Sequence, residues 1–359
     1  MAAPHSVDMM PRKNRMDGKG KIVLVTGATS GMGRLLVKRL LESGYEVRVI
    51  LRKSPSEHPE WMDLPKGVRV YVADIALTDR ETVKELERAS KDVSILFHLA
   101  AVTYNYRSNY GERVNTNVMI ETNVVGTENI LQAYSEANKT GRLRLLFASS
   151  TAVYGSKRAG ETLTEESDPS PNNSYGESKY MAEQVIKAFA SANPRLKYTI
   201  MRIGVIYGKG YERNFMKVFK LLKEGRLVYV GKGNNHLPLV NVQDVVDGFI
   251  DAAGSERSAN KIYNLTDGVP YTQRMLFKKA AELMGASEPS KRIHPFIAKL
   301  GARARGIEAG QLNFLLSDRI VSIERIKREI GFKPKISIDE GGRELANEFL
   351  RRYKRGEAI

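Results

Sequence analysis

Two residues that could move a proton, Tyr175 and Lys179, stand four positions apart in the segment SYGESKY. In a helix this spacing places both side chains on one face. A free phenol titrates at about pH 10, whereas a neighbouring ammonium favours the phenolate and lowers the pKa of the phenol. Of the sixteen tyrosines in the chain, only Tyr175 has a lysine at the fourth position after it. We therefore expect Tyr175 to act as a general acid and base, assisted by Lys179.

A third candidate is a hydroxyl run, Ser149 to Thr151, that follows the apolar segment RLRLLFA. The apolar segment predicts a buried strand, so the hydroxyls stand at its carboxyl end. A polar turn is one interpretation of such a run. The other, which we favour, is that Ser150 holds the oxygen of a substrate next to Tyr175.

The segment TGATSGMG joins the first predicted strand, KIVLVTG, to the first predicted helix, MGRLLVKRLLESG. Glycines at this junction allow a tight turn and close approach of the backbone to a ligand, and the amino end of the helix favours a pyrophosphate. The pattern predicts a dinucleotide site. The residues assigned to it here are Gly27, Thr29, Ser30, Gly31, Met32 and Gly33.

The residues that follow the second strand, YEVRVILR, distinguish between the two nicotinamide dinucleotides. An acidic residue there binds the ribose hydroxyls, whereas an arginine accommodates a 2′-phosphate. This strand ends in Leu51, Arg52 and Lys53 with no carboxylate. We expect NADP, bound with the help of Arg52 and Lys53, and keep NAD as the alternative.

These residues need a scaffold, and the first half of the chain alternates strand and helix patterns. That alternation predicts an α/β fold, a doubly wound (Rossmann) parallel sheet that binds ligands at the carboxyl ends of its strands. The second half mixes helical segments with short strands. We expect a dinucleotide-binding domain over 20–204 plus about 238–266, and a smaller, mainly helical substrate domain over 205–237 and 267–359.

Composition narrows the class of protein. The chain has 359 residues, no Cys and five scattered His, which predicts no disulfide framework and no metal site. The net charge is +16, spread along the chain without a nucleic-acid-binding signature, so we expect no nucleic-acid partner. No apolar run is long enough to span a membrane, and residues 1–19 predict a disordered basic leader. We expect a cytoplasmic enzyme.

Taken together, these motifs resemble the extended branch of the short-chain dehydrogenase/reductase superfamily, the NAD-dependent epimerase/dehydratase family. The resemblance covers roughly residues 20 to 345 and adds the segments HLAA, NVVGT, SSTAVYG, MRIGVIYG and LVNVQDVVDG. It implies that Tyr175 is the acid/base, that Lys179 binds the nicotinamide ribose, and that Ser150 is the catalytic hydroxyl. Further cofactor contacts implied by the resemblance are Asp74, Ile75, Leu99, Ala100, Ala101, Asn123 and Ser149, together with Tyr175 and Lys179.

Several departures from the family pattern bear on the reaction. The glycine loop reads TGxxxGxG, with Ser30 in place of the middle glycine usual in the extended branch. Dehydratases of the family carry an acid pair after the hydroxyl, where this chain has Thr151 and Ala152. Sugar-nucleotide members usually have an Asn and an Arg at the positions of Val205 and Leu237, and their loss disfavours a diphosphate ligand.

We therefore expect an NADP-linked oxidoreductase that moves hydride between the cofactor and a carbonyl or secondary alcohol in a small-molecule substrate. One alternative is a nucleotide-sugar 4-epimerase with tightly bound NAD(P), and a second is a dinucleotide-sensing protein without catalysis. The residues expected near the substrate are Tyr104, Val205 and Tyr207. Members of the family often form homodimers through two helices, which here correspond to 116–138 and 175–192.

Overall fold

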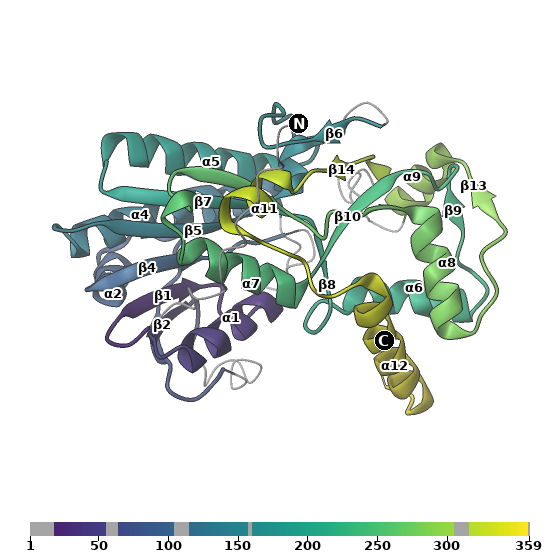
Figure 1. Ribbon diagram of the computed structural model, residues 1–359, viewed down its shortest axis with the longest axis horizontal. Helices are drawn as coiled ribbons and strands as arrows, with labels where there is room; N and C mark the ends of the chain where they lie inside the picture. The colour runs from purple at the N-terminus through teal and green to yellow at the C-terminus, as the bar shows by residue number, and fades with distance from the viewer. Residues whose placement is uncertain (1–17, 55–63, 104–114, 157–159, 305–315, 358–359) are drawn as a thin grey trace, which may run out of the picture.

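The structure is a computed structural model that describes residues 18–54, 64–103, 115–156, 160–304 and 316–357. It has two lobes, a larger one built on a central sheet and a smaller one that contains most of the last third of the chain (Figure 1). Within the described ranges, no helix has both the length and the apolar character needed to cross a bilayer.

The larger lobe contains a seven-stranded sheet in the order β11-β7-β5-β4-β1-β2-β3, and every neighbouring pair is parallel. The order reverses between β1 and β4, so the predicted doubly wound sheet is confirmed. The strands are β1 (Ile22–Thr26), β2 (Glu46–Leu51), β3 (Arg69–Val72), β4 (Val93–His98), β5 (Leu143–Ser150), β7 (Leu196–Ile203) and β11 (Lys261–Leu265).

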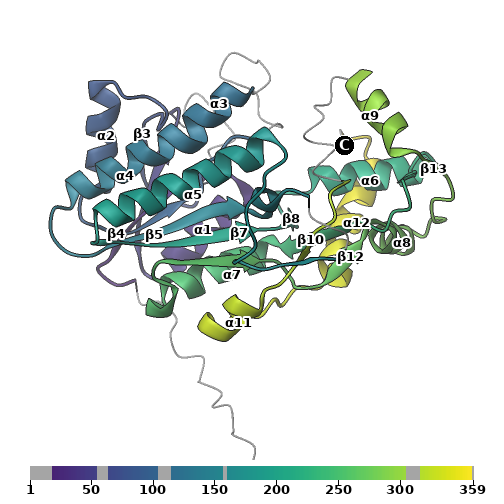
Figure 2. The same cartoon turned by 90° about the horizontal axis from the view of Figure 1, so that it is seen from above.

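Side chains of the central strands alternate between two apolar cores, as the period of two in a strand requires. In β1, Val23 and Val25 belong to one core and Leu24 to the other. The first core is covered by α1 (Gly31–Glu42), α7 (Val242–Ala253) and α11 (Glu324–Ile330), and the second by α2 (Arg80–Ser90), α4 (Gly126–Ala137) and α5 (Ser174–Ala192). Figure 2 shows the two layers of helices on opposite faces of the sheet.

The smaller lobe is built around a three-stranded sheet in the order β12-β10-β8. Its core includes Tyr207, Phe219 and Phe349, from one strand and two helices. Its elements are β8 (Val205–Tyr207), α6 (Arg213–Lys223), β9 (Tyr229–Val230), β10 (His236–Asn241), β12 (Pro270–Thr272), α8 (Gln273–Met284), β13 (Arg292–Ile293), α9 (Pro295–Ala304) and α12 (Ile338–Lys354). The two-residue strands β6 (Thr162–Leu163) and β14 (Ile320–Val321) pair separately, and η5 (Glu256–Ser258) is a short 3-10 turn.

Two features differ from the sequence-based expectation. The segment 267–359 was assigned wholly to the smaller lobe, but Ile323, Ile326 and Phe332 pack in the core beside the central sheet. The helix expected over 116–138 is divided into α3 (Thr116–Ile120), a π-helical turn η3 (Glu121–Val125) and α4. The first difference is a long-range packing contact, which local periodicity does not report.

Candidate active site

A cavity of about 240 Å³ opens at the carboxyl ends of β1, β2, β3 and β4. This is the reversal point of the sheet, where doubly wound folds bind their ligands. The cavity brings together many of the residues that the sequence analysis assigned to the cofactor. Its lining residues are Thr26, Gly27, Ala28, Thr29, Ser30, Ile50, Leu51, Arg52, Ala73, Asp74, Ile75, Leu99, Ala100, Ala101, Val102 and Thr122.

The glycine loop is shaped by close backbone contacts. Gly27 has φ +72°, and a Cβ built there would lie 2.7 Å from the amide nitrogen of Ala100. A Cβ on Gly33 would lie 2.2 Å from the carbonyl oxygen of Gly27. A side chain at position 27 would therefore clash with the backbone after β4, and one at position 33 would push the first helix away from the glycine loop.

Ser30, the departure from the glycine pattern, caps the first helix. Its hydroxyl accepts a hydrogen bond from the Gly33 N–H at 3.0 Å and donates one to the Gly27 carbonyl at 2.9 Å. A serine cap orders the amino end of α1, where the helix dipole favours an anion. The structure thus accommodates the TGxxxGxG spacing in a loop suited to a pyrophosphate.

A buried histidine fixes β1 to β4 beneath this loop. The Nδ1 of His98 lies 2.7 Å from the Thr26 hydroxyl, and its Nε2 lies 2.9 Å from the Thr127 hydroxyl. The Thr26 hydroxyl also accepts a hydrogen bond from the Ala100 N–H. Burial, with a smaller contribution from the charge of Lys179, lowers the pKa of His98 to about 3, so this ring is neutral.

The catalytic candidates lie on β5 and the first two turns of α5. Asn173 caps α5 by accepting the Gly176 N–H, which sets the helix start just before Tyr175. The Ser150 hydroxyl, at the last residue of β5, hydrogen-bonds to the Tyr175 phenol. Lys179 is 1% exposed, and its Nζ lies 4.1 Å from the centre of the Phe147 ring. The structure therefore brings Ser150, Tyr175 and Lys179 to one region.

The pKa shifts at this site run against the expectation from the sequence. Burial raises the pKa of Tyr175 to about 12, and the Ser150 hydrogen bond only partly offsets the increase. Burial also lowers the pKa of Lys179 to about 7, although the Glu183 carboxylate opposes that change. The expected lowering of the Tyr175 pKa by Lys179 is not seen here, because burial dominates the shift and Lys179 is not among the groups that change it.

Sequence reasoning missed a buried ion pair behind the catalytic candidates. Glu183, one turn after Lys179, pairs with Arg202 of β7 at 2.7 Å, and the two side chains are 0% and 2% exposed. The hydroxyl of Ser149 donates to the same carboxylate at 2.5 Å, so this side chain binds a protein group. The sequence did contain a signal for Glu183: Tyr175, Lys179 and Glu183 follow one another at steps of four, which places all three on one face of the helix.

Asn123 is buried between the loop after β4 and α5. Its amide group accepts from the Val102 N–H, at 2.8 Å, and donates to the Val102 carbonyl and to the Ser178 hydroxyl. Among the predicted cofactor residues, Asn123 thus connects the loop after β4 to α5 without lining the cavity. The π-helical turn places it there.

The smaller lobe also reaches the amino end of α1. The hydroxyl of Tyr211 lies 3.4 Å from the Met32 amide nitrogen and accepts its hydrogen. A Cβ on Gly31 would lie 2.9 Å from the Tyr211 ring. Of the predicted cofactor residues, Gly31, Met32 and Gly33 belong to this helix start, and Lys53 is not among the lining residues of the cavity.

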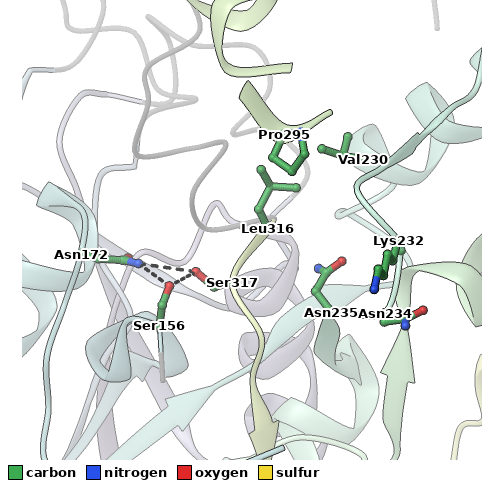
Figure 3. Close-up of a pocket in the computed structure, with 10 residues that line it drawn as sticks. Ser156, Asn172, Val230, Lys232, Asn234, Asn235, Pro295, Leu316 and Ser317 are labelled. Carbon is green, nitrogen blue, oxygen red and sulfur yellow. Dashed lines mark hydrogen bonds between the residues drawn. The ribbon is translucent and has the colours of Figure 1, made fainter. Parts of the chain in front are cut away.

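A second cavity, of about 530 Å³, lies between segments of both lobes. Figure 3 shows Lys232, Asn234 and Asn235 on one side and the hydrogen-bonded group of Ser156, Asn172 and Ser317 on the other. Asn172 donates to the Ser156 hydroxyl at 2.8 Å, and the two serine hydroxyls lie 2.7 Å apart. The remaining lining residues are Val230, Gly233, Pro295 and Leu316.

The residues predicted near the substrate lie elsewhere. Tyr207 is fully buried in the core of the smaller lobe, and its hydroxyl donates to the Ile336 carbonyl at 3.0 Å. Val205 and Leu237 are partly buried against the same core. These side chains pack the lobe and line neither cavity, which differs from the prediction that Val205 and Tyr207 contact the substrate. Tyr104 lies outside the described residues.

Comparison with known proteins decides the family. The model of the NAD dependent epimerase/dehydratase family matches residues 23–266, which is more than half of the chain. The chain belongs to this family. The resemblance stated from the sequence is thereby confirmed, and the residues of the first cavity lie within the matched segment.

Family members similar to this chain act in different ways. A UDP-glucose 4-epimerase of Vibrio cholerae is 26% identical over 93% of this chain and 97% of its own length. A 3 beta-hydroxysteroid dehydrogenase/Delta 5→4-isomerase of Mycobacterium tuberculosis is 27% identical over 87% of this chain and 86% of its own. A dTDP-glucose 4,6-dehydratase structure from Streptomyces venezuelae, with NAD bound, is 25% identical, with a TM-score of 0.71 over 94% of this chain and 98% of that one.

The protein is therefore an NAD-dependent enzyme of the epimerase/dehydratase type. The cavity at the strand ends fits a dinucleotide, because it combines a glycine loop, a capped helix start and an arginine after β2. In this family member, the two residues after Ser150 are Thr151 and Ala152, which are fully buried in the 3-10 turn η4 (Thr151–Tyr154). Neither side chain carries a carboxylate.

Proposed function

We propose that the protein is a nucleotide-sugar 4-epimerase that retains NAD(P) through its catalytic cycle. The observation that carries this proposal is the second cavity, which offers a lysine ammonium and three side-chain amides, those of Asn172, Asn234 and Asn235. These groups suit a ligand with phosphates and hydroxyls. They supply amide and ammonium donors of the kind that Val205 and Leu237 lack. The full-length similarity to the Vibrio cholerae epimerase supports the same choice.

The residues of the first site suit a reversible oxidation. Tyr175 would take the proton of the substrate hydroxyl on its phenolate oxygen, and Ser150 would donate a hydrogen bond to the same substrate oxygen. Oxidised nicotinamide, when bound, supplies a hydride acceptor and a positive charge. Lys179 would hold its ribose. Once the keto sugar has rotated to present its other face, the hydride would return to the same carbon while Tyr175 returns the proton to the oxygen, so that only the configuration at that carbon changes and the dinucleotide ends oxidised as it began.

The raised pKa of Tyr175 fits this scheme once the charges are considered. A phenol with a pKa of about 12 is protonated at neutral pH and needs a neighbouring positive charge to act as a base. Protonated Lys179 and a cationic nicotinamide both favour the phenolate. Tyr175 would therefore become a strong base only when the dinucleotide is bound, and its phenol would keep its proton in the empty site.

For the cofactor we propose NADP in preference to NAD. Arg52 lines the cavity directly after β2, and residues 51–53 include no carboxylate that could bind the ribose hydroxyls. Family neighbours such as the Streptomyces venezuelae dehydratase bind NAD, which makes the choice testable. A competition titration of NADP against NAD on the purified protein would measure this preference directly.

A second candidate is a dehydrogenase or reductase that acts on an uncharged alcohol or ketone. One observation favours it: the Mycobacterium tuberculosis relative acts on a hydroxysteroid by name. The two candidates differ in what happens to the cofactor. An epimerase keeps its dinucleotide and needs no added reductant, whereas a reductase exchanges it at every turnover.

The deciding experiment uses the purified full chain. UDP-sugars are incubated with the protein without added dinucleotide, and the products are followed by ¹H NMR for inversion at the sugar C4. Epimerisation with retained dinucleotide supports the proposal. Stoichiometric NADPH consumption with ketones, and no epimerisation, supports the second candidate.

A homodimer also stays a proposal. The segments expected to pair lie on the same face of the central sheet, where α4 and α5 run side by side (Figure 2). Met181 of α5 is 37% exposed on this face and would be covered in a dimer. Sedimentation analysis would test the assembly. The cytoplasmic location likewise remains a prediction.

A further inference from the structure

The helix α9 (Pro295–Ala304) carries an exposed apolar patch formed by Phe296, Ile297 and Leu300. Their side chains are 68%, 59% and 61% exposed, more than any other large apolar side chain in the described part of the protein. Leu300 follows Phe296 by four residues and Ile297 by three, so its side chain is a surface neighbour of both on the helix. Three large apolar side chains gathered on one side indicate a contact surface, since single exposed residues are ordinary but clusters are not.

The same segment is strongly basic. Residues 291–305, KRIHPFIAKLGARAR, contain five Lys or Arg and no Asp or Glu. Lys291 and Arg292 stand just before the helix and are exposed. The whole chain has a net charge of +16, so no acidic surplus elsewhere compensates for this segment. A short helix with an apolar side and flanking cations has the composition of helices that lie in the interface of anionic bilayers.

The helix α9 lies at the surface of the smaller lobe, and its apolar side chains are exposed there. The helix lies at the outer edge of the smaller lobe in both views (Figures 1 and 2). It is attached at its start, where β13 pairs with β9 and where Pro295 lines the second cavity. A Cβ on Gly231 would lie 3.5 Å from the Pro295 ring, so the first turn packs on the loop after β9.

We propose that α9 docks the protein on the surface of an anionic lipid bilayer. Phe296, Ile297 and Leu300 enter the boundary between headgroups and acyl chains, while Lys291 and Arg292 contact lipid phosphates. The helix has ten residues, about half the length needed to cross a bilayer, so it lies in the interface and does not span it. Docking brings the second cavity, which Pro295 lines, close to the bilayer surface.

Vesicle flotation of the full chain tests this surface. We expect the protein to float with vesicles of phosphatidylcholine and phosphatidylglycerol, to bind pure phosphatidylcholine weakly, and to be released by high salt. The variant Phe296→Ser/Ile297→Ser/Leu300→Ser is expected to bind the mixed vesicles at least about tenfold more weakly, because apolar burial supplies much of the affinity. Lys291→Gln/Arg292→Gln is expected to lose the preference for phosphatidylglycerol.

Matched variants keep the test independent of folding. Leu77→Ser removes a leucine that is 52% exposed on the larger lobe, and this variant is expected to bind like the wild type. The single variant Leu300→Ser is expected to give an intermediate loss. Thermal unfolding and dinucleotide binding of each variant report whether the fold is intact.

Three outcomes would overturn the proposal. The first is that the wild type does not float with the mixed vesicles at low salt. The second is that the triple variant binds them as well as the wild type does. The third is an oligomer that the triple variant dissociates while neither protein binds vesicles, which would assign the patch to a contact between copies. None of these readouts requires enzymatic turnover, so the result for membrane docking does not depend on whether the proposed epimerase activity is correct.

Discussion

The Glu183 carboxylate holds the Arg202 guanidinium through two hydrogen bonds, Nε to Oε1 at 3.0 Å and Nη2 to Oε2 at 2.7 Å. The pair joins α5 to β7 across 19 residues of sequence and is almost completely excluded from solvent. Because Glu183 follows Lys179 by one helical turn, this pair fixes the segment that carries Tyr175 and Lys179. The site is thus supported from behind by a buried charge pair.

The first prediction concerns this pair. Glu183→Gln leaves the Arg202 charge buried without its counter-ion, so we expect the free energy of unfolding to fall by about 3–5 kcal/mol. Denaturant unfolding measures the loss. Glu324→Gln, which removes an exposed partner of Lys327, is the matched control and is expected to change little. Equal losses in both variants would show that burial does not set the contribution of Glu183.

The second prediction concerns proton transfer. Tyr175→Phe removes the phenolic oxygen and is expected to lower kcat about 10²–10⁴-fold while dinucleotide affinity stays close to that of the wild type. Steady-state kinetics and a fluorescence titration measure the two quantities. Tyr353→Phe, at an exposed position on α12, is the control. Wild-type turnover by the Tyr175 variant would rule out its assignment as the acid/base.

The third prediction concerns pH and Lys179. Burial lowers the pKa of Lys179 to about 7, whereas a lysine in the unfolded chain titrates at about 10.4. Between these values the unfolded chain binds a proton that the folded protein lacks, so this residue makes stability rise with pH across that window. Relative to Lys179→Met, the wild type should be least stable at about pH 7 and below, and the difference should shrink toward about pH 10.

Unfolding of both proteins across the pH range measures that difference, and groups common to the two proteins cancel. A difference in unfolding free energy that stays constant with pH would mean that Lys179 keeps an ordinary pKa in the folded protein.

The fourth prediction concerns the dinucleotide. Arg52→Ala is expected to weaken NADP binding by about tenfold or more and to leave NAD binding nearly unchanged, because only NADP carries the 2′-phosphate that a charged hydrogen bond would recognise. Lys66→Ala is the matched control, since Lys66 is exposed before the start of β3 and is not among the lining residues of the cavity. Competition titrations give both constants, and equal affinity of the wild type for NADP and NAD would contradict the assignment of Arg52.

The fifth prediction concerns the second cavity. Lys232→Gln is expected to raise KM for a UDP-sugar about tenfold with little change in kcat, since a charge-assisted contact to a phosphate far from the reacting carbon contributes to binding alone. Lys217→Gln, at an exposed position on α6, is the control. An unchanged KM would separate this cavity from the substrate and would favour the reductase candidate.

The amino-acid sequence by itself determined the features that depend on short spacings. The alternation of strand and helix patterns predicted the parallel sheet, the glycines at 27 and 33 predicted the dinucleotide loop, and the step of four between Tyr175 and Lys179 predicted their common helix face. These patterns are local, because the periods of strands and helices and the steric freedom of glycine act over a few residues. They also carried the resemblance to the family.

Only the tertiary structure decided how these parts meet. Tyr207 is buried in the core of the smaller lobe. The polar groups of the second cavity include Lys232 and Asn172, which the fold brings together from separate segments. The tertiary structure also raised the pKa of Tyr175 and lowered that of Lys179, since desolvation depends on every atom packed around a charge. Contacts between residues far apart in the chain, and the water they exclude, leave no periodic trace in a single sequence.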